Sequence, residues 1–473
     1  MVENGSTKIL VDCGTFYGDE AGPEDKKDKG DFSFDPKTID ALLVTHAHAD
    51  HTGRIPQLVR SGFKGPIYMT EPTLKLLEAA MYSQVFFDDS YKRDWSWSKN
   101  NKYNIVHWRS DCEGKQNIKK ANLCEMSGRY EELNQKHPEL KGCNKCKGLD
   151  TNDCLRNVKT IGYDEKLALG GFTIVFRPVE HLPGSAAIYF RGGGTSFLFS
   201  GDLGTFRSRT ANPVPVSSKV DAVFIESTYG DKPGKNEKET EQEYDRFAKV
   251  VKGALNQGKL VWIPAFAMDR TQRVMLELVK CGANPTAFYS CSTSGNTMTE
   301  FYLDNPQLFP KEVTNLWPQF KKLYSRKKRF ELDKSQTSSA VLLTTSGMMD
   351  HGSSYDYLDK LLPDSNVVLC LVGYQSPGTP GAQLKSGAKT IELKEGKKVD
   401  VRATVESFDC FSGHGDAREN DHWLGENVHS KIYLIHGDPD SLKERKAGLE
   451  KRFGSNVEIV ERNKKYHLGS AVK

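Results

Sequence analysis

Long apolar segments, an N-terminal signal sequence and a strong net charge are all missing from this sequence. No run approaches the ~20 apolar residues that a membrane-spanning helix needs, so no membrane association is expected. Residues 1–7 are polar and lack the apolar core of a signal peptide. The formal net charge is only +4, with 66 Lys and Arg against 62 Asp and Glu. A basic groove for nucleic acid would therefore have to be local.

The ten cysteines are not expected to form disulfides, because a chain without a secretory signal is expected in the reducing cytoplasm. Five of them lie apart from the rest: Cys112, Cys124, Cys143, Cys146 and Cys154. The CxxC spacing of the third and fourth is typical of a zinc knuckle, but a second CxxC is missing. A structural zinc, unligated thiols and disulfides all stay open for this segment. The other five have apolar surroundings and are predicted to be buried packing residues: Cys13, Cys281, Cys291, Cys370 and Cys410.

The 473 residues exceed what one compact core holds, and they predict two or three domains. Short apolar runs of strand length alternate with helical patterns, which predicts an α/β fold with substantially buried strands. The predicted strands include 39–45, 197–200, Ala222–Glu226, Leu260–Pro264, 341–345, 367–372 and Lys431–Ile435. Helical patterns span 242–256 and 270–281.

Three regions break this alternation. Residues 18–34 are charged and contain glycine, which predicts a loop, and residues 88–157 are polar, aromatic-rich and cysteine-rich, which predicts an insertion. Residues 324–334 include the basic cluster 326–329, which either assists RNA binding or is a solvated surface loop.

Metal-ligating residue types concentrate in one run, His46-Ala-His48-Ala-Asp50-His51, which follows an apolar strand and precedes a helix-like segment at 52–60. Residues two apart on an extended turn point the same way, so His46 and His48 can share one metal ion. Asp50 and His51 begin the helix and can face a second ion. Imidazole and carboxylate without thiolate suit zinc in a hydrolytic site that keeps a position open for water. The alternative is a polar loop that is rich in histidine by chance.

Further ligands must come from other strand ends. His181, Asp202 and His436 each follow a predicted strand, and ligands gather at the carboxyl ends of strands in α/β folds. A single histidine or aspartate in such a position more often has a structural role than a functional one. The two oxygens of Asp202 can each take one metal ion, so Asp202 is the candidate bridge.

These motifs, in this order, resemble the metallo-β-lactamase superfamily. Asp12 matches the early aspartate of that fold, which orients a ligating histidine. The continuation resembles the β-CASP branch in three positions: Glu226 in Glu-Ser-Thr-Tyr-Gly230, His414 in Phe411-Ser-Gly-His-Gly-Asp416, and His436. The branch's signature turns are matched at 263–267 with Arg270, at 346–348, and at 373–379. The similarity is greatest to the nuclease subunit of the cleavage and polyadenylation specificity factor and to its bacterial and archaeal relatives.

The resemblance implies a four-layer αβ/βα sandwich with an inserted α/β β-CASP domain. Residues 1–230 and 406–473 are assigned to the metallo-β-lactamase domain and residues 231–405 to the β-CASP domain, with the active site between them. This sequence departs from the family in two ways. It begins almost at Asp12, without the usual Gly-rich strand, and its cysteine-rich stretch is longer than the usual connection.

The resemblance further implies a zinc-dependent ribonuclease, endonucleolytic or 5′-exonucleolytic, acting on single-stranded RNA. His436 favours RNA, since the DNA-repair members usually have valine there. By hypothesis, His46, His48, His181 and Asp202 bind one zinc ion, and Asp50, His51, Asp202 and His436 bind the other. A hydroxide activated by both ions would attack phosphorus, and His414, oriented and kept protonated by Glu226, would protonate the leaving oxygen.

Backbone N–H groups and hydroxyls at Ser346, Gly347 and Thr379 are the candidates for holding phosphates, with ordinary turn geometry as the alternative. Arg270 either pairs with phosphate or caps the domain interface. Three other functions stay open: a thioesterase on the same fold, a nuclease for DNA, and a non-catalytic scaffold that binds RNA or a partner. A cytoplasmic location is expected, and the sequence leaves the oligomeric state open, with a homodimer as one possible form.

Overall fold

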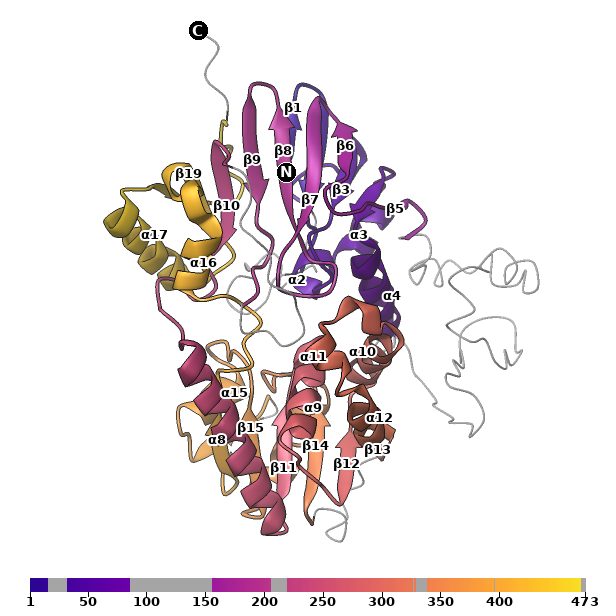
Figure 1. Cartoon of the computed structure of the whole chain (residues 1–473), viewed down its shortest axis with the longest axis vertical. Helices are drawn as coiled ribbons and strands as arrows, with labels where there is room; N and C mark the ends of the chain where they lie inside the picture. Colours follow the sequence, from indigo (N-terminus) through magenta and orange to yellow (C-terminus); the bar gives the residue numbers. More distant parts are fainter. Residues whose placement is uncertain are drawn as a thin grey trace, which may run out of the picture.

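The computed structural model describes residues 1–15, 32–85, 155–205, 219–325, 327–328, 338–394 and 396–468. Two lobes lie one above the other in Figure 1, and the chain passes from the upper lobe to the lower one and back. The upper lobe contains two sheets and the N-terminus, and the lower lobe contains a third large sheet.

The first sheet of the upper lobe has the order β1-β2-β3-β4-β5. Its strands are β1 Val2–Asn4, β2 Thr7–Val11, β3 Ala41–Leu43, β4 Ile67–Met69 and β5 Val158–Thr160. All pairs are parallel except β1 with β2.

The second sheet combines five strands from the first half of the chain with the last two strands, in the order β20-β19-β10-β9-β8-β7-β6. Its strands are β6 Lys166–Leu169, β7 Phe172–Pro178, β8 Ala186–Gly192, β9 Thr195–Phe199, β10 Ala222–Glu226, β19 Lys431–Ile435 and β20 Asn456–Ile459. Strand β10 pairs in parallel with β9 on one side and with β19 on the other, in the register Ala222 to Lys431. The last part of the chain therefore completes a sheet that the first part began.

Apolar side chains between these two sheets form one core, which includes Ile9 and Leu43 from the first sheet and Phe176 and Phe224 from the second. The outer face of the first sheet is covered by α3 Ile55–Arg60 and α4 Glu71–Val85. The outer face of the second is covered by α16 Ala417–Leu424 and α17 Pro439–Phe453. The layers are thus helix, sheet, sheet, helix, and the predicted four-layer sandwich is confirmed.

The lower lobe has a parallel sheet of order β13-β12-β14-β11-β15-β18. Its strands are β11 Leu260–Pro264, β12 Ala287–Ser290, β13 Lys327–Lys328, β14 Ala340–Thr344, β15 Val367–Leu371 and β18 Thr404–Ser407. A small hairpin joins β16 Thr390–Glu392 to β17 Lys398–Asp400. The predicted domain boundary between residues 405 and 406 falls within β18, which belongs to this sheet by its pairing with β15.

Helices cover both faces of this sheet. They are α8 Glu237–Asn256, α9 Arg270–Lys280, α10 Thr293–Asp304, α11 Lys311–Thr314, α12 Trp317–Ser325, α13 Gly352–Asp356, α14 Leu358–Leu361 and α15 Pro380–Lys385. Strand β11 shows why its sequence is a continuous apolar run. Val261 and Ile263 face one core, and Leu260 and Trp262 face the other, so no side chain of this central strand meets water.

The helix predicted to follow His51 is interrupted. The structure has α2 Ala49–Thr52 and then α3, with Gly53 as the C-cap of the first helix. Pro56 lies in the first turn of α3, where its missing N–H is tolerated but where it cannot continue a preceding helix. Asp50 and His51 still lie at the start of a helix, but of the shorter one.

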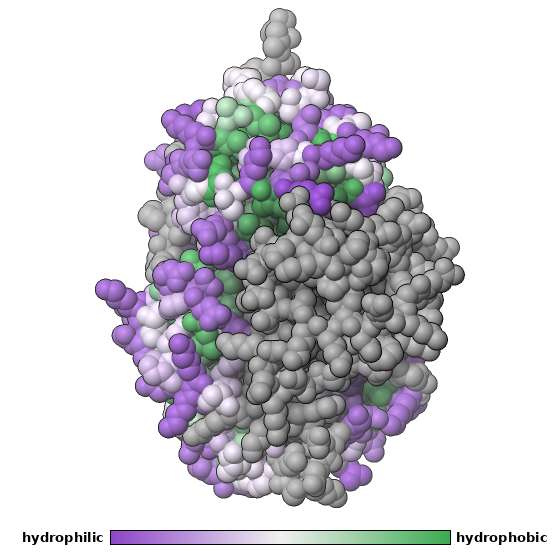
Figure 2. Space-filling view, turned by 90° about the vertical axis from the view of Figure 1, so that its right-hand side faces the viewer, coloured by the Kyte–Doolittle hydropathy of each residue, from purple (hydrophilic) through white to green (hydrophobic). Residues whose placement is uncertain are grey.

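The two lobes share a continuous apolar contact. Helix α4 of the upper lobe packs against α10 of the lower lobe, and residues of both helices, such as Leu77 and Met298, belong to one core. Hydrophilic residues dominate the described surface on the face shown in Figure 2, where hydrophobic residues emerge mainly in the upper part. No helix among the described residues has the length and apolar character needed to cross a membrane.

The five cysteines outside the cysteine-rich segment are all free thiols. Cys13, Cys370 and Cys410 are buried as predicted, but Cys281 and Cys291 are only half-buried, because each lies just past the end of an element, α9 or β12. The predicted loop at 18–34, the cysteine-rich segment and the basic cluster at 326–329 fall largely or wholly outside the described residues.

Candidate metal centre and catalytic site

The candidate site lies where strands of both upper sheets end. Strand β3 leads to the His46–His51 run, and β7 leads to His181. Strand β9 leads to Asp202, and β19 leads to His436. These side chains, which the sequence places far apart, converge because the carboxyl ends of parallel strands lie at one edge of a sheet.

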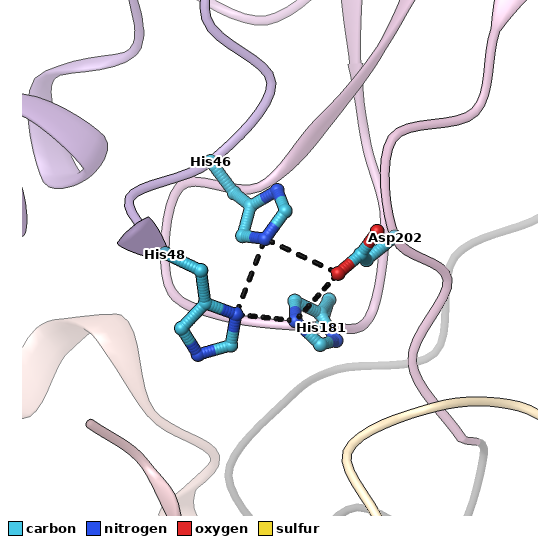
Figure 3. A group of neighbouring side chains, drawn as sticks. All are labelled: His46, His48, His181 and Asp202. Carbon is cyan, nitrogen blue, oxygen red and sulfur yellow. Dashed lines mark hydrogen bonds and ion pairs between the residues drawn. The ribbon is translucent and has the colours of Figure 1, made fainter. Parts of the chain in front are cut away.

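Four side chains form the first group, shown in Figure 3. His46 Nε2 lies 3.2 Å from His48 Nδ1, which in turn lies 2.9 Å from His181 Nε2. Asp202 Oδ2 lies 3.4 Å from His46 Nε2 and 3.6 Å from His181 Nε2. Three imidazole nitrogens and one carboxylate oxygen therefore face a common centre, and this set of donors could hold a metal ion.

A second group shares Asp202 with the first and adds Asp50, His51 and His436. The other oxygen of Asp202, Oδ1, lies 3.1 Å from His51 Nε2 and 3.8 Å from His436 Nδ1. His436 Nε2 lies 3.4 Å from Asp50 Oδ2. Asp202 thus has one oxygen in each group, so its carboxylate could contribute a ligand to each of two ions.

In three of the imidazoles, the nitrogen that points away from the centre is held by the protein. Asp12 Oδ2 lies 2.7 Å from His51 Nδ1, and the backbone oxygen of Gly413 lies 2.8 Å from His181 Nδ1. The hydroxyl of Thr45 lies 3.0 Å from His46 Nδ1. Such contacts fix the ring and leave Nε2 free to take a metal ion.

Three buried atoms of this cluster have no hydrogen-bond partner among the described residues: both oxygens of Asp202 and His51 Nε2. Burial raises the pKa of Asp202, but His436, His51 and His46 outweigh it and hold the pKa well below the usual range of a carboxyl group. An ionised, buried carboxylate without hydrogen bonds is costly unless a cation neutralises it. The residues present therefore fit a pair of bound cations.

A third group, Glu226, His414 and His436, has the residue types of a metal site but is already satisfied by hydrogen bonds. Glu226 Oε1 accepts from the backbone N–H of Leu203 at 2.8 Å and lies 3.0 Å from His414 Nδ1. Glu226 Oε2 accepts from the hydroxyl of Thr228 at 2.6 Å. This group is therefore better suited to orienting histidines than to binding an ion.

The electrostatics at His414 favour its protonated form. Burial lowers the pKa of His414, but the fully buried carboxylate of Glu226 more than offsets this effect, and the pKa is raised above its ordinary value. Because Nδ1 faces Glu226, Nε2 is the nitrogen left to face a substrate.

The loops that carry the site pack closely against one another at glycine residues, where no side chain would fit. A Cβ atom on Gly14 would lie 1.5 Å from the backbone oxygen of Asp50, and one on Gly204 would lie 1.3 Å from that of Glu180. Asp12 and His436 have positive φ angles of 60° and 50°, where non-glycine residues are strained. Hydrogen bonds hold both backbones: Asp12 N donates to Leu43 O, and Ser227 N donates to His436 O, each at 2.8 Å.

Of the predicted phosphate-binding residues, Arg270 lies close to one of the histidines. A Cβ on Gly413 would lie 3.5 Å from both Arg270 Nη2 and His181 Cε1, so the two side chains flank the same glycine. Arg270 is buried and donates from Nη1 to Val372 O at 2.7 Å, and its Nε has no hydrogen-bond partner in the part of the chain that the structure describes.

The other three predicted phosphate-binding residues lie in turns with local partners. The hydroxyl of Ser346 donates to Asp350, and Gly347 O accepts from Gln375 Nε2 at 3.0 Å. Thr379 caps α15, since its hydroxyl accepts from Ala382 N at 3.2 Å and donates to Ser376 O at 2.7 Å. Phosphate binding by these residues stays a prediction, and so does a structural zinc at the cysteine-rich segment, which lies outside the described residues.

Several residues near the site were not singled out in the sequence. Ser412 Oγ accepts from His414 N at 3.1 Å and lies 2.8 Å from the hydroxyl of Tyr229. Arg273 Nη1 donates to Ser412 O at 2.7 Å. Thr45 and Thr228 contact histidines through their hydroxyls. The only feature of the sequence that could have indicated these residues is their closeness to predicted site residues, since most of them lie within a few positions of one.

Three family models match the chain. The model of the metallo-beta-lactamase superfamily covers residues 1–242, and the Beta-Casp domain covers residues 271–384. The Zn-dependent metallo-hydrolase RNA specificity domain covers residues 398–460. Together they span both lobes and the returning segment.

Similar proteins agree with these models. Ribonuclease TTHA0252 of Thermus thermophilus is 30% identical over 450 residues, which are 93% of this chain and 89% of the relative. Transcription termination factor FttA of Methanococcus maripaludis is 27% identical over 462 residues, which cover 91% of this chain but 63% of the relative. A crystal structure from Enterococcus faecalis, of a protein of unknown function, has the same fold, with a TM-score of 0.51, 11% identity, and coverage of 98% of this chain and 94% of that one.

Proposed function

Because the chain belongs to the metallo-β-lactamase superfamily and carries a β-CASP domain, we propose that it is a metal-dependent ribonuclease that hydrolyses phosphodiester bonds of single-stranded RNA. The observation that carries the proposal is the position of Asp202, whose two oxygens each face a separate group of nitrogen ligands. The match to an RNA specificity domain and the similarity to a protein named as a ribonuclease support RNA as the substrate.

In this proposal zinc is the metal. His46, His48 and His181 would hold one ion and Asp50, His51 and His436 the other, with Asp202 shared. When bound, the ions would supply Lewis-acid chemistry, which activates a water molecule near neutral pH and stabilises negative charge on the phosphate.

The protein's own side chains would complete the reaction. Glu226 keeps His414 protonated and directs its Nε2 outward, so His414 would donate a proton to the leaving oxygen of the RNA. Arg270 lies beside Gly413, and its buried Nε has no hydrogen-bond partner among the described residues, so Arg270 would contact the phosphate backbone. Location in the cytoplasm and a homodimer stay predictions.

The proposal is tested by incubating the zinc-loaded chain with end-labelled single-stranded RNA and with DNA of the same sequence. We expect cleavage of RNA but not of DNA, with a product ladder distinguishing internal cuts from stepwise 5′ removal. His414→Ala should keep its zinc and lose cleavage. Preferential cleavage of DNA, or no cleavage of either by a zinc-loaded chain, would reject the ribonuclease assignment.

A further inference from the structure

Two carboxylates, the half-buried Asp12 and the fully buried Glu226, border the candidate site, and each of them reaches two histidines. Asp12 Oδ2 lies 2.7 Å from His51 Nδ1 and also accepts from the hydroxyl of Thr45 at 2.8 Å. The same hydroxyl lies 3.0 Å from His46 Nδ1. Asp12 therefore contacts one histidine directly and the other through a threonine.

Glu226 repeats this arrangement with two other histidines. Its Oε1 lies 3.0 Å from His414 Nδ1, and its Oε2 accepts from the hydroxyl of Thr228 at 2.6 Å. The hydroxyl of Thr228 lies 3.0 Å from His436 Nδ1. One histidine is again contacted directly and the other through a threonine.

The direction of these hydrogen bonds determines which nitrogen of His436 is free. A hydroxyl has one hydrogen, and that of Thr228 is given to Glu226, so Thr228 can only accept from His436. His436 Nδ1 must then carry the hydrogen, and Nε2 keeps its lone pair. Nε2 is the atom 3.4 Å from Asp50 Oδ2, within the second group of candidate ligands.

We propose that Thr228 is a positioning residue that relays the orienting effect of Glu226 to His436. One buried carboxylate thereby orients both the proton donor His414 and the metal ligand His436. The inference rests on the proposed function, and it assigns to Thr228 a role that its place in the Glu226-Ser-Thr228 segment does not reveal.

The backbone around Thr228 is held independently of its side chain. Ser227 N donates to His436 O at 2.8 Å, and a Cβ on Gly437 would lie 2.6 Å from Ser227 O, so the two loops are in close contact. Removing only the hydroxyl should therefore change the orientation of the His436 ring and leave the loops in place.

Zinc titration of the chelator-treated chain tests this proposal with a matched pair of variants. Thr228→Val keeps the shape but removes the hydroxyl, and Thr228→Ser keeps the hydroxyl. We expect Thr228→Val to weaken one of the two zinc-binding steps at the site by about 10–100-fold, the usual effect of losing such an outer contact. The other step should not change, and Thr228→Ser should restore both.

Three titration results would overturn the proposal: wild-type affinity in Thr228→Val, equal losses in both variants, or loss of both zinc-binding steps. A second measurement needs no Thr228 variant. In the zinc-loaded wild-type chain labelled with ¹⁵N-histidine, the resonances absent from His436→Asn should show a protonated Nδ1 and a metal-bound Nε2. The opposite tautomer would also overturn the proposal.

The titration and the spectrum use zinc alone, so they do not depend on RNA cleavage. A chain that binds zinc as expected in all three forms but leaves RNA intact would reject the proposed function and support the relay. If the wild-type chain cleaves RNA but Thr228→Val binds zinc with wild-type affinity, the proposed function is supported and the relay through Thr228 is rejected.

Discussion

At the scale of single residues, several candidate histidines have one ring nitrogen anchored by the protein and the other directed into the site. His414 shows the consequence for proton transfer. Its Nδ1 lies 3.0 Å from a carboxylate that is wholly buried, so the charge of Glu226 acts on His414 with little screening by solvent. The raised pKa of His414 follows from this charge, which outweighs the opposing effect of burial.

We predict that Glu226→Gln shifts the alkaline limb of the pH profile to lower pH. If protonated His414 is the acid, cleavage falls as the pH rises through its raised pKa. Replacing the carboxylate by an amide removes the charge that raises this pKa, so the fall should begin at lower pH. The measurement is kcat against pH for the wild type and the variant, both loaded with zinc. An alkaline limb at the same pH in both would show that Glu226 does not control the acid.

At the scale of elements, the site depends on how closely the loops after neighbouring strands approach one another. The loop after β2 contacts the His46–His51 run at Gly14, where no side chain fits. Cys13 N donates to His51 O and Thr15 N donates to Ala49 O, at 2.8 and 2.9 Å, so the two segments are joined on both sides of this glycine.

We predict that Gly14→Ala destabilises the fold and weakens zinc binding. The added methyl group would overlap the backbone of Asp50, and such overpacking typically costs about 1–3 kcal/mol. Gly253→Ala is the matched control, because this glycine lies in α8 with no atom within 4 Å of an added Cβ. Alanine should stabilise that helix by up to about 1 kcal/mol. Urea unfolding measures both changes, and a Gly14→Ala variant as stable as the wild type would contradict the packing described.

At the scale of the whole molecule, the site is assembled from segments that span nearly the entire chain. Asp12 lies near its start, and His436 follows the strand that pairs with β10. The lower lobe contributes Arg270 and Arg273, and its α10 packs against α4 of the upper lobe. Neither lobe alone contains all the parts of the candidate site.

Much of this architecture was predictable from the sequence. Strands such as β10 and β11 are buried along their whole length, so they appear as uninterrupted apolar runs with clear ends. Three histidines and an aspartate lie within six positions after an apolar run of this kind. Such a short motif can be recognised from the sequence without knowledge of the fold. The break between α2 and α3 was missed, although Gly53 and Pro56 mark it.

The contacts that connect the candidate residues were not predictable in this way. Glu226 and His414 lie 188 positions apart, and their 3.0 Å contact exists only because β10 and the returning segment meet. The contact between Thr228 and His436 depends on the same packing of distant segments, and no periodic pattern in the sequence marks it. The family resemblance suggested which residues matter but not how threonine hydroxyls connect them.

We propose that Asp202 holds two metal ions that the chain needs to cleave RNA. This proposal is tested most directly by zinc content and RNA cleavage in Asp202→Ala, with Asp440→Ala as the control, since the Asp440 side chain is 91% exposed on α17. We predict that Asp202→Ala binds about two fewer zinc ions per chain and does not cleave RNA, whereas the control matches the wild type in both respects. Full zinc content together with wild-type cleavage in Asp202→Ala would contradict the account.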